Sequence, residues 1–268
     1  MDKFPQISEA QLIEFAKGIE LMATKVLEGA HFSKRGGEGL EFHSSRPYAD
    51  GEDVRFIDWK RFAATDRYFI KNFERQEKTG WSIFLDRSGS MAYGQKNEWA
   101  QNFIGCIIFL ARSLGDSWSL YPLEEMDVSV ALKNLLSRQA GVNFEKTELP
   151  DVPKGNRILV ISDLFFDSKV LKDRLAEWEA QGHSIYLIQC LDSQEAHFSF
   201  SDAIEFHDLE SADRLLLDSR TVQKPYLYAL SALNREWDQL LGSHSFRIQM
   251  TATIKDLEKQ LLEFFERL

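Results

Sequence analysis

The segment Trp81–Met91, WSIFLDRSGSM, decides the fold of this chain. Its largely apolar start, followed by turn-forming residues, predicts a buried strand that ends at Asp86. A second segment of the same kind, RILVISD at Arg157–Asp163, also ends in an aspartate. Residues 97–114, which lie between them, have the apolar pattern of a helix. Strands that alternate with helices predict an α/β fold, a mostly parallel sheet with helices on both faces.

Other segments extend this pattern in both directions along the chain. Further strands are predicted at WSLYPL (118–123), HSIYLIQCL (183–191), AIEFHDL (203–209) and SFRIQM (245–250). MDVSVAL (126–132) is predicted as one more strand, beside 118–123, followed by a short helical piece through Leu136. Amphipathic helices are predicted at residues 8–29, 170–181, 225–241 and 254–268.

Composition excludes several classes of protein. The chain has 268 residues, with 32 Lys and Arg against 42 Asp and Glu, a net charge of −10, which argues against a general nucleic-acid binder. The clean apolar run Phe103–Ala111 is far short of the roughly 20 residues that cross a bilayer. The N-terminus lacks the pattern of a secretory signal, so we expect a cytoplasmic protein without a membrane span. Cys106 and Cys190 lie in apolar segments, which indicates buried free thiols.

Asp86 and Asp163 are the first candidate site residues. Carboxyl ends of parallel strands meet at one edge of a sheet, so both side chains face one crevice if their strands are neighbours. Ser88 and Ser90 alternate with Asp86 on the loop that follows the first strand. Carboxylate and hydroxyl oxygens are ligands that Mg²⁺ prefers. The alternative is that Asp-x-Ser-x-Ser forms only a turn and a helix cap.

Enzymatic motifs are not found in this sequence. Ser88 lacks the glycine two residues earlier that a nucleophile elbow requires, and no phosphate-binding G-x-x-x-x-G-K-[ST] occurs. The six histidines show no H-E-x-x-H spacing. An aspartyl-phosphate mechanism would need an aspartate where Ser88 stands. We therefore expect a protein that is not an enzyme, with a metal-dependent hydrolase as the alternative.

Two segments resemble known families. WSIFLDRSGSM resembles the metal-ion-dependent adhesion site of von Willebrand factor A-type domains. RPYADGEDVRFIDW, which begins at Arg46, is similar to the signature of the bacterial family called domain of unknown function fifty-eight, with Glu52 in place of its first aspartate. The residues that fill this signature are Arg46, Tyr48, Gly51, Asp53, Arg55, Ile57, Asp58 and Trp59.

The resemblance implies a fold, a metal site and a function. It implies a von Willebrand factor A-like domain at residues 80–268, preceded at 1–79 by a helix and the irregular signature segment. Its metal ligands would be Asp86, Ser88, Ser90 and Asp163, holding Mg²⁺ or Mn²⁺. A complete site also has a threonine before a helix, and Thr147 is a poor match because no helix-length segment follows it, so binding would be weak.

The function that the resemblance implies is noncatalytic protein binding. Members of the family are thought to be adaptors of MoxR-type AAA+ ATPases, which would bind through this metal site. The alternatives are a metal-dependent hydrolase and a structural module that holds no metal. The signature segment interleaves charges with aromatic residues such as Tyr48 and Trp59, so it either packs on the main domain or contacts a partner directly.

Overall fold

The computed structural model divides the chain into two compact units, residues 1–31 with 79–268, and residues 32–78. The helix near the N-terminus belongs to the larger unit, although it lies before the expected domain boundary at residue 80. The structure describes residues 7–29, 40–47, 61, 65, 68–75, 80–123, 127–137, 140–145, 147–166, 169–200, 203–207 and 214–268.

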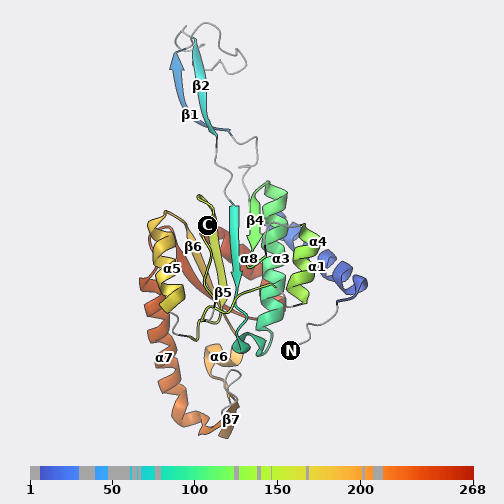
Figure 1. Ribbon diagram of the computed structural model, residues 1–268, viewed down its shortest axis with the longest axis vertical. Coiled ribbons are helices and arrows are strands. Elements are labelled where there is room, and N and C mark those ends of the chain that lie inside the picture. Colours follow the sequence, from blue (N-terminus) through green and yellow to red (C-terminus); the bar gives the residue numbers. More distant parts are fainter. Residues whose placement is uncertain are drawn as a thin grey trace. The chain divides into compact units, whose positions relative to one another are not determined.

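The larger unit is built on a parallel sheet of five strands in the order β4-β3-β5-β6-β9 (Figure 1). Its strands are β3 (Gly80–Leu85), β4 (Ser117–Leu120), β5 (Arg157–Ser162), β6 (Ile185–Leu191) and β9 (Phe246–Thr251). Its helices are α1 (Glu9–Gly29), α3 (Lys96–Leu114), α4 (Val128–Leu136), α5 (Lys169–Ala180), α6 (Ser193–His197), α7 (Ser219–Gln239) and α8 (Leu257–Arg267), with short 3₁₀ turns η2 (Gly89–Ala92) and η3 (Ile254–Asp256). The predicted α/β class and parallel sheet are confirmed.

Two antiparallel strand pairs complete the described structure. In the smaller unit, β1 (Leu40–Pro47) pairs with β2 (Phe69–Arg75). In the larger unit, β7 (Ala203–His207) pairs with β8 (Arg214–Asp218). Neither pair joins the five-stranded sheet.

Helices cover both faces of the parallel sheet. On β5, Leu159 and Ile161 point into one core, which α1, α3, α4 and α8 complete. Ile158 and Val160 point into the other core, which includes residues of α5 and α7. Because both faces are buried, the strands are nearly continuous apolar runs rather than alternating ones. This is why the apolar runs identified the central strands so clearly.

Two sequence predictions about local structure are wrong. A strand is expected at residues 126–132, but the described residues from Asp127 onward begin α4, because the side chain of Asp127 caps this helix by accepting the Ser129 N–H at 2.8 Å. The helix expected at residue 225 begins at Ser219, where Asp218 caps it in the same way, and Pro225 lies inside its second turn. The alternating V-S-V pattern of α4 imitated the period of a strand.

Helix α3 lies in the core. In α3, Phe103, Ile107 and Ile108 have no exposed surface. Cys106 and Cys190 are buried free thiols, as the sequence predicted. Among the helices that the structure describes, none is long and apolar enough to cross a bilayer.

Close packing of α1 on α3 explains why the N-terminal helix joins the larger unit. Ile19, Ala23 and Val26 of α1 are almost fully buried. A Cβ atom at Gly105 of α3 would lie 2.8 Å from the Cδ1 atom of Ile19. The glycine therefore allows the two helices to approach closely.

We predict that Ile19→Ala lowers the free energy of unfolding by about 2–5 kcal/mol, because it leaves a cavity in a packed core. Ile13→Ala on the same helix is the matched control, because Ile13 is 47% exposed. Its effect should stay within about 0.5 kcal/mol. Urea unfolding of the full chain measures both, and equal midpoints would show that α1 does not pack on the domain in solution.

Candidate functional site

The site lies at the switch point of the parallel sheet, where the chain adds β4 on one side of β3 and then β5 on the other. β3 has β4 on one side and β5 on the other, and Leu85 pairs with Ile161 in parallel register. Asp86 follows β3 and Asp163 follows β5, so both carboxylates lie at the same edge of neighbouring strands. Such switch points are the usual ligand positions of open α/β sheets. Both aspartates are buried, with at most 1% of their surface exposed.

The loop after β3 is held firmly by backbone contacts. The N–H of Asp86 donates to the carbonyl of Ile161 at 2.8 Å, and the N–H of Arg87 donates to that of Val142 at 2.9 Å. Gly141 has φ +117°, and a Cβ atom there would lie 2.4 Å from the Cγ atom of Arg87. This position therefore requires glycine.

Arg87 ties the same loop to two helices. Its guanidinium donates to Asn97 Oδ1 of α3 at 2.6 Å and to the carbonyl of Ala140, which follows α4. It also reaches the carbonyl of Leu135 at 3.4 Å. The loop is therefore a rigid part of the fold.

Asp86 is satisfied by donors from the protein itself. Its Oδ2 accepts a hydrogen bond from the Ser162 hydroxyl at 2.5 Å, and its Oδ1 accepts one from the N–H of Ser88 at 2.8 Å. Burial raises the pKa of Asp86 to about 6, although these two hydrogen bonds act against the rise. The Asp86 carboxyl therefore acts as an internal hydrogen-bond acceptor of the loop.

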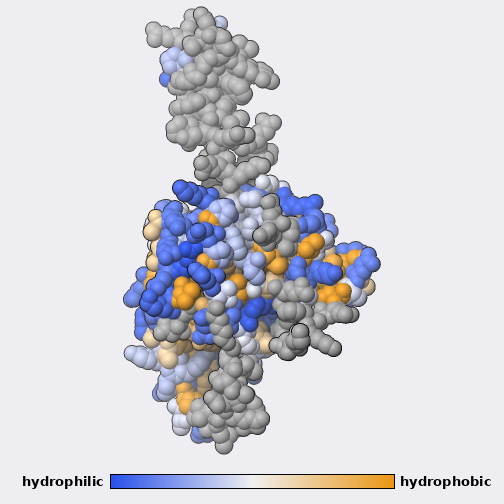
Figure 2. Space-filling view, in the orientation of Figure 1, coloured by the Kyte–Doolittle hydropathy of each residue, from blue (hydrophilic) through white to orange (hydrophobic). Residues whose placement is uncertain are grey.

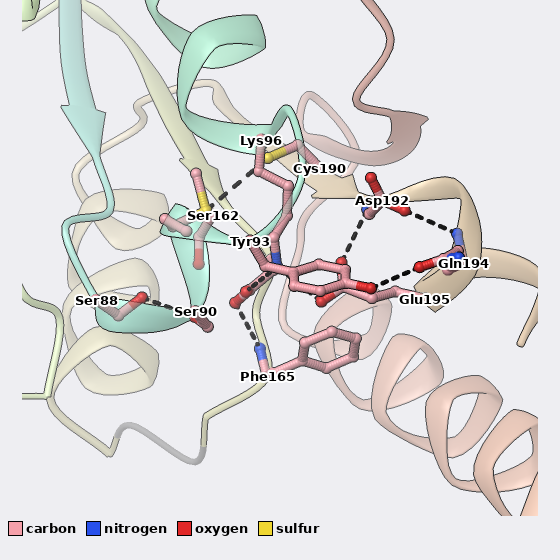
Figure 3. A network of polar contacts seen from close by, with 12 residues as sticks. Ser88, Ser90, Tyr93, Lys96, Ser162, Phe165, Cys190, Asp192, Gln194 and Glu195 are labelled. Carbon is pink, nitrogen blue, oxygen red and sulfur yellow. Dashed lines mark hydrogen bonds and ion pairs between the residues drawn. The ribbon is translucent and has the colours of Figure 1, made fainter. Parts of the chain in front are cut away.

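Ser88 and Ser90 lie at the surface end of this arrangement. Their hydroxyl oxygens are 3.0 Å apart and form a hydrogen bond (Figure 3). Both residues are half-buried, in contrast to Asp86. Of the four predicted ligands, these two serines keep some exposed surface, whereas Asp86 and Asp163 have at most 1%.

Sequence reasoning missed the central residue of the site, Lys96. Its side chain has no exposed surface, and its Nζ lies 2.8 Å from Asp163 Oδ2 and 2.8 Å from Glu195 Oε1 (Figure 3). Burial favours the neutral amine, but the two carboxylates outweigh it and raise the pKa of Lys96 above its ordinary value. Lys96 is therefore a buried ammonium ion that joins the start of α3 to the end of β5 and to α6.

Glu195 is held in place by a capping box at the start of α6. Its Oε2 accepts the N–H of Asp192 at 2.8 Å, and Asp192 Oδ1 accepts the N–H of Gln194 at 2.9 Å. The Tyr93 hydroxyl donates to Gln194 Oε1 at 2.7 Å, as Figure 3 shows. Burial raises the pKa of Glu195, while the neighbouring Lys96 lowers it. Oε1 of Glu195 is thereby left to face the ammonium group.

Two aromatic rings complete the surroundings of the ammonium. The Nζ of Lys96 lies 5.8 Å from the ring centre of Tyr93 and 5.9 Å from that of Phe165. Both distances are within the range of cation–π attraction. Phe165 also contacts Tyr226 of α7, with ring centres 6.5 Å apart. Phe165 remains 36% exposed, so an aromatic surface lies beside the buried charge.

Of the remaining predicted site residues, the structure describes Thr147 and Arg46. Thr147 lines a surface pocket with Asp173 and Arg174 of α5. In the signature, Arg46 belongs to β1 and pairs with Ile70. The other signature residues lie outside the described residues: Tyr48, Gly51, Asp53, Arg55, Ile57, Asp58 and Trp59.

The donors at this site do not fit a divalent ion as they are arranged. Both oxygens of Asp86 accept hydrogen bonds, as do both oxygens of Asp163, from Lys96 at 2.8 Å and from the N–H of Phe165 at 3.3 Å. Within the described part of the chain, no group of three or more His, Cys, Asp or Glu residues could hold a metal. An ion at Asp163 would have to displace the ammonium of Lys96. Binding of Mg²⁺ or Mn²⁺ stays a prediction that this geometry does not support.

The sequence contains features that could have indicated Lys96 and Glu195 as site residues. A lysine in the first turn of a helix is unfavourable next to the positive end of the helix dipole, and α3 is otherwise largely apolar. Such a lysine needs an acidic partner. Asp192 and Glu195 have the D-x-x-E spacing of a capping box. No local sequence pattern predicts that Lys96 pairs with these carboxylates, because Lys96 lies 67 residues from Asp163 and 99 from Glu195.

We predict that Lys96→Met lowers the free energy of unfolding by about 3–5 kcal/mol, because it leaves Asp163 as a buried charge without its partner. Lys96→Met combined with Asp163→Asn should recover part of this loss, because the second change removes that charge. Urea unfolding of the wild type, Lys96→Met, Asp163→Asn and the double variant measures this, and full additivity of the two single effects would contradict the pairing.

Lys169→Met is the matched control for Lys96→Met. Lys169 pairs with Asp173 at 2.7 Å, almost the same distance, but its side chain is 88% exposed. Exposed ion pairs contribute little to stability, so the midpoint of Lys169→Met should be nearly that of the wild type.

Comparisons with known proteins give a partial match. Residues 44–131 match the model of the family described as "Protein of unknown function DUF58". This range includes Asp86, Ser88, Ser90 and Lys96. No curated protein sequence matches the chain. The crystal structure of conserved hypothetical protein BatB from Bacteroides thetaiotaomicron is similar, with 10% identity and a TM-score of 0.38, over 70% of this chain and 98% of that one.

Proposed function

We propose that this chain is a noncatalytic protein-interaction module. Its binding face is formed by Ser88, Ser90 and Phe165, and we call these three residues the loop face. The observation that carries the proposal is the pairing of the fully buried Lys96 with the fully buried Asp163 and the largely buried Glu195. A buried ion pair of this kind gives structure to a site, whereas a general base or a nucleophile must reach its substrate.

The loop face has properties that favour binding. Its two half-buried hydroxyls can donate and accept hydrogen bonds, and Phe165 offers part of an aromatic ring. Aromatic residues beside polar groups are typical anchors of protein interfaces. Because Arg87 and the backbone of β5 hold the loop, little conformational entropy is lost on binding.

The visible surface gives little support to a broad apolar interface. Figure 2 shows small, separate hydrophobic patches on a mainly hydrophilic surface of the larger unit. A partner that binds the surface seen in this view must therefore use mixed polar and aromatic contacts. The loop face has this mixed character.

The partner class comes from the family resemblance. The match of residues 44–131 to DUF58 supports the resemblance stated from the sequence. We propose an adaptor role for a MoxR-type AAA+ ATPase, in a larger unit of the von Willebrand factor A type. A parallel sheet with aspartates after two neighbouring strands at its switch point is compatible with that fold.

The hydrolase alternative is disfavoured by the hydrogen bonds of the site. Metal-dependent hydrolysis needs carboxylate oxygens that can bind an ion and activate a water molecule. At Asp86 and Asp163 each oxygen already accepts a hydrogen bond from the protein. A purely structural module remains an outcome of the following test.

We predict that the tagged full chain captures an AAA+ ATPase from extract of its native cell, and that Ser88→Arg and Phe165→Ala each weaken capture by about tenfold or more. Changes at interface anchors have effects of at least this order. The measurement is quantitative mass spectrometry of the captured ATPase. Thermal melts of each variant would confirm that it is folded.

Tyr228→Ala is the matched control, because Tyr228 is an aromatic residue of α7 that is 73% exposed. It lies two residues from Tyr226 and so on a different side of the helix. It should leave capture unchanged. Equal capture by every variant would place the interface elsewhere, and failure to capture any ATPase would reject the partner class.

A further inference from the structure

A positive charge is already present inside the site where the family resemblance implies a metal ion. The ammonium of Lys96 contacts two carboxylates and lies near two aromatic rings, with no exposed surface. Figure 3 shows the side chains of Tyr93, Glu195 and Phe165 near this ammonium. These groups surround a cation from several sides.

The ammonium of Lys96 compensates negative charge on the acidic residues of the site. Asp86, Asp163 and Glu195 are acidic, and Asp163 acts electrostatically on both Asp86 and Glu195. Lys96 supplies the compensating charge at Asp163 and Glu195, while Asp86 is stabilised by neutral donors from Ser162 and Ser88. Addition of a divalent ion would put two more positive charges close to a buried ammonium. In a medium less polar than water this repulsion is large.

The geometry of the oxygens leads to the same conclusion. Mg²⁺ binds oxygen ligands at about 2.0–2.1 Å in octahedral geometry and needs lone pairs that point at one centre. Asp163 Oδ2 already directs a lone pair at the ammonium of Lys96, 2.8 Å away. Asp86 Oδ2 is directed at the Ser162 hydroxyl. One lone pair of each of these oxygens thus points at a donor of the protein rather than at a common centre.

We infer that the ammonium of Lys96 is the permanent cation of this site and takes the place of a divalent metal ion. A covalently attached cation cannot be removed by a chelator. The site therefore keeps its shape without any added ion. This inference concerns the charge of the site itself and stands whether or not the loop face binds a protein.

Removal of the ammonium should turn the site into a metal site. In Lys96→Ala, the carboxylates of Asp163 and Glu195 lose their partner and border an unfilled space, with Asp86 nearby. We expect Mn²⁺ to bind this variant about a hundredfold more tightly than the wild type, the order expected when a nearby repelling charge is deleted. Mn²⁺ should also raise the melting temperature of the variant and leave that of the wild type unchanged.

The experiment is a titration of the full chain with Mn²⁺, followed by the electron paramagnetic resonance signal of free Mn²⁺. Wild type, Lys96→Ala, Asp163→Asn and the double variant Lys96→Ala with Asp163→Asn are compared. Tight binding that appears in Lys96→Ala and is lost in the double variant supports the inference. Mn²⁺ binding by the wild type that Asp163→Asn abolishes overturns it, because the ion would then coexist with Lys96 or displace it.

Lys96→Gln covers the case in which Lys96→Ala does not fold, because it keeps most of the side-chain volume without the charge. If Lys96→Ala is unfolded alone and Mn²⁺ restores the circular dichroism spectrum of a folded chain, this also supports the inference. A folded Lys96→Gln or Lys96→Ala chain that binds Mn²⁺ no better than the wild type overturns the inference, since the charge of Lys96 would then not be what excludes the ion.

Discussion

The ion pairs of Lys96 are the constraint on which the site depends. One ammonium group joins the first turn of α3, the end of β5 through Asp163, and α6 through Glu195. A buried charge is tolerated only with partners of good geometry, so these three segments must meet correctly for the domain to be stable. The same requirement fixes the position of Phe165, whose N–H donates to Asp163 Oδ1 at 3.3 Å. The aromatic part of the loop face is thus positioned by a buried charge.

The buried carboxyl of Asp86, close to that of Asp163, is stabilised in a different way. It receives no direct bond from Lys96 and depends on Ser162, which directly follows Ile161 of β5. The Ser162 oxygen also accepts the N–H of Leu164 at 2.9 Å, so one hydroxyl supports both loops. Because Asp86 is buried and lies near Asp163, its pKa is raised, which limits the charge that must be stabilised inside the fold. Neutral hydrogen-bond donors therefore stabilise Asp86, and the ammonium of Lys96 stabilises Asp163.

Much of the fold could be predicted from the sequence, because β3, β5 and β6 are buried on both faces and form nearly continuous apolar runs. The convergence of Asp86 and Asp163 followed from the rule for parallel strands. Helix α4 was misassigned, since an alternating pattern outweighed the capping signal of Asp127. Lys96 could not be placed, because residues far apart in sequence are brought together only by the order of the strands. Local patterns carry no information about such pairs.

The nature of the cation determines how a partner can bind. A metal ion at a surface site can keep one coordination position free for a carboxylate of the partner. An ammonium with no exposed surface cannot do this, since its bonds are used inside the protein. In our proposal a partner instead contacts Ser88, Ser90 and Phe165, and hydrogen bonds to Asp86 and Asp163 hold the backbone of Ser88 and Phe165. Recognition would then depend on shape and hydrogen bonding at a rigid surface, and it would not respond to the supply of divalent ions.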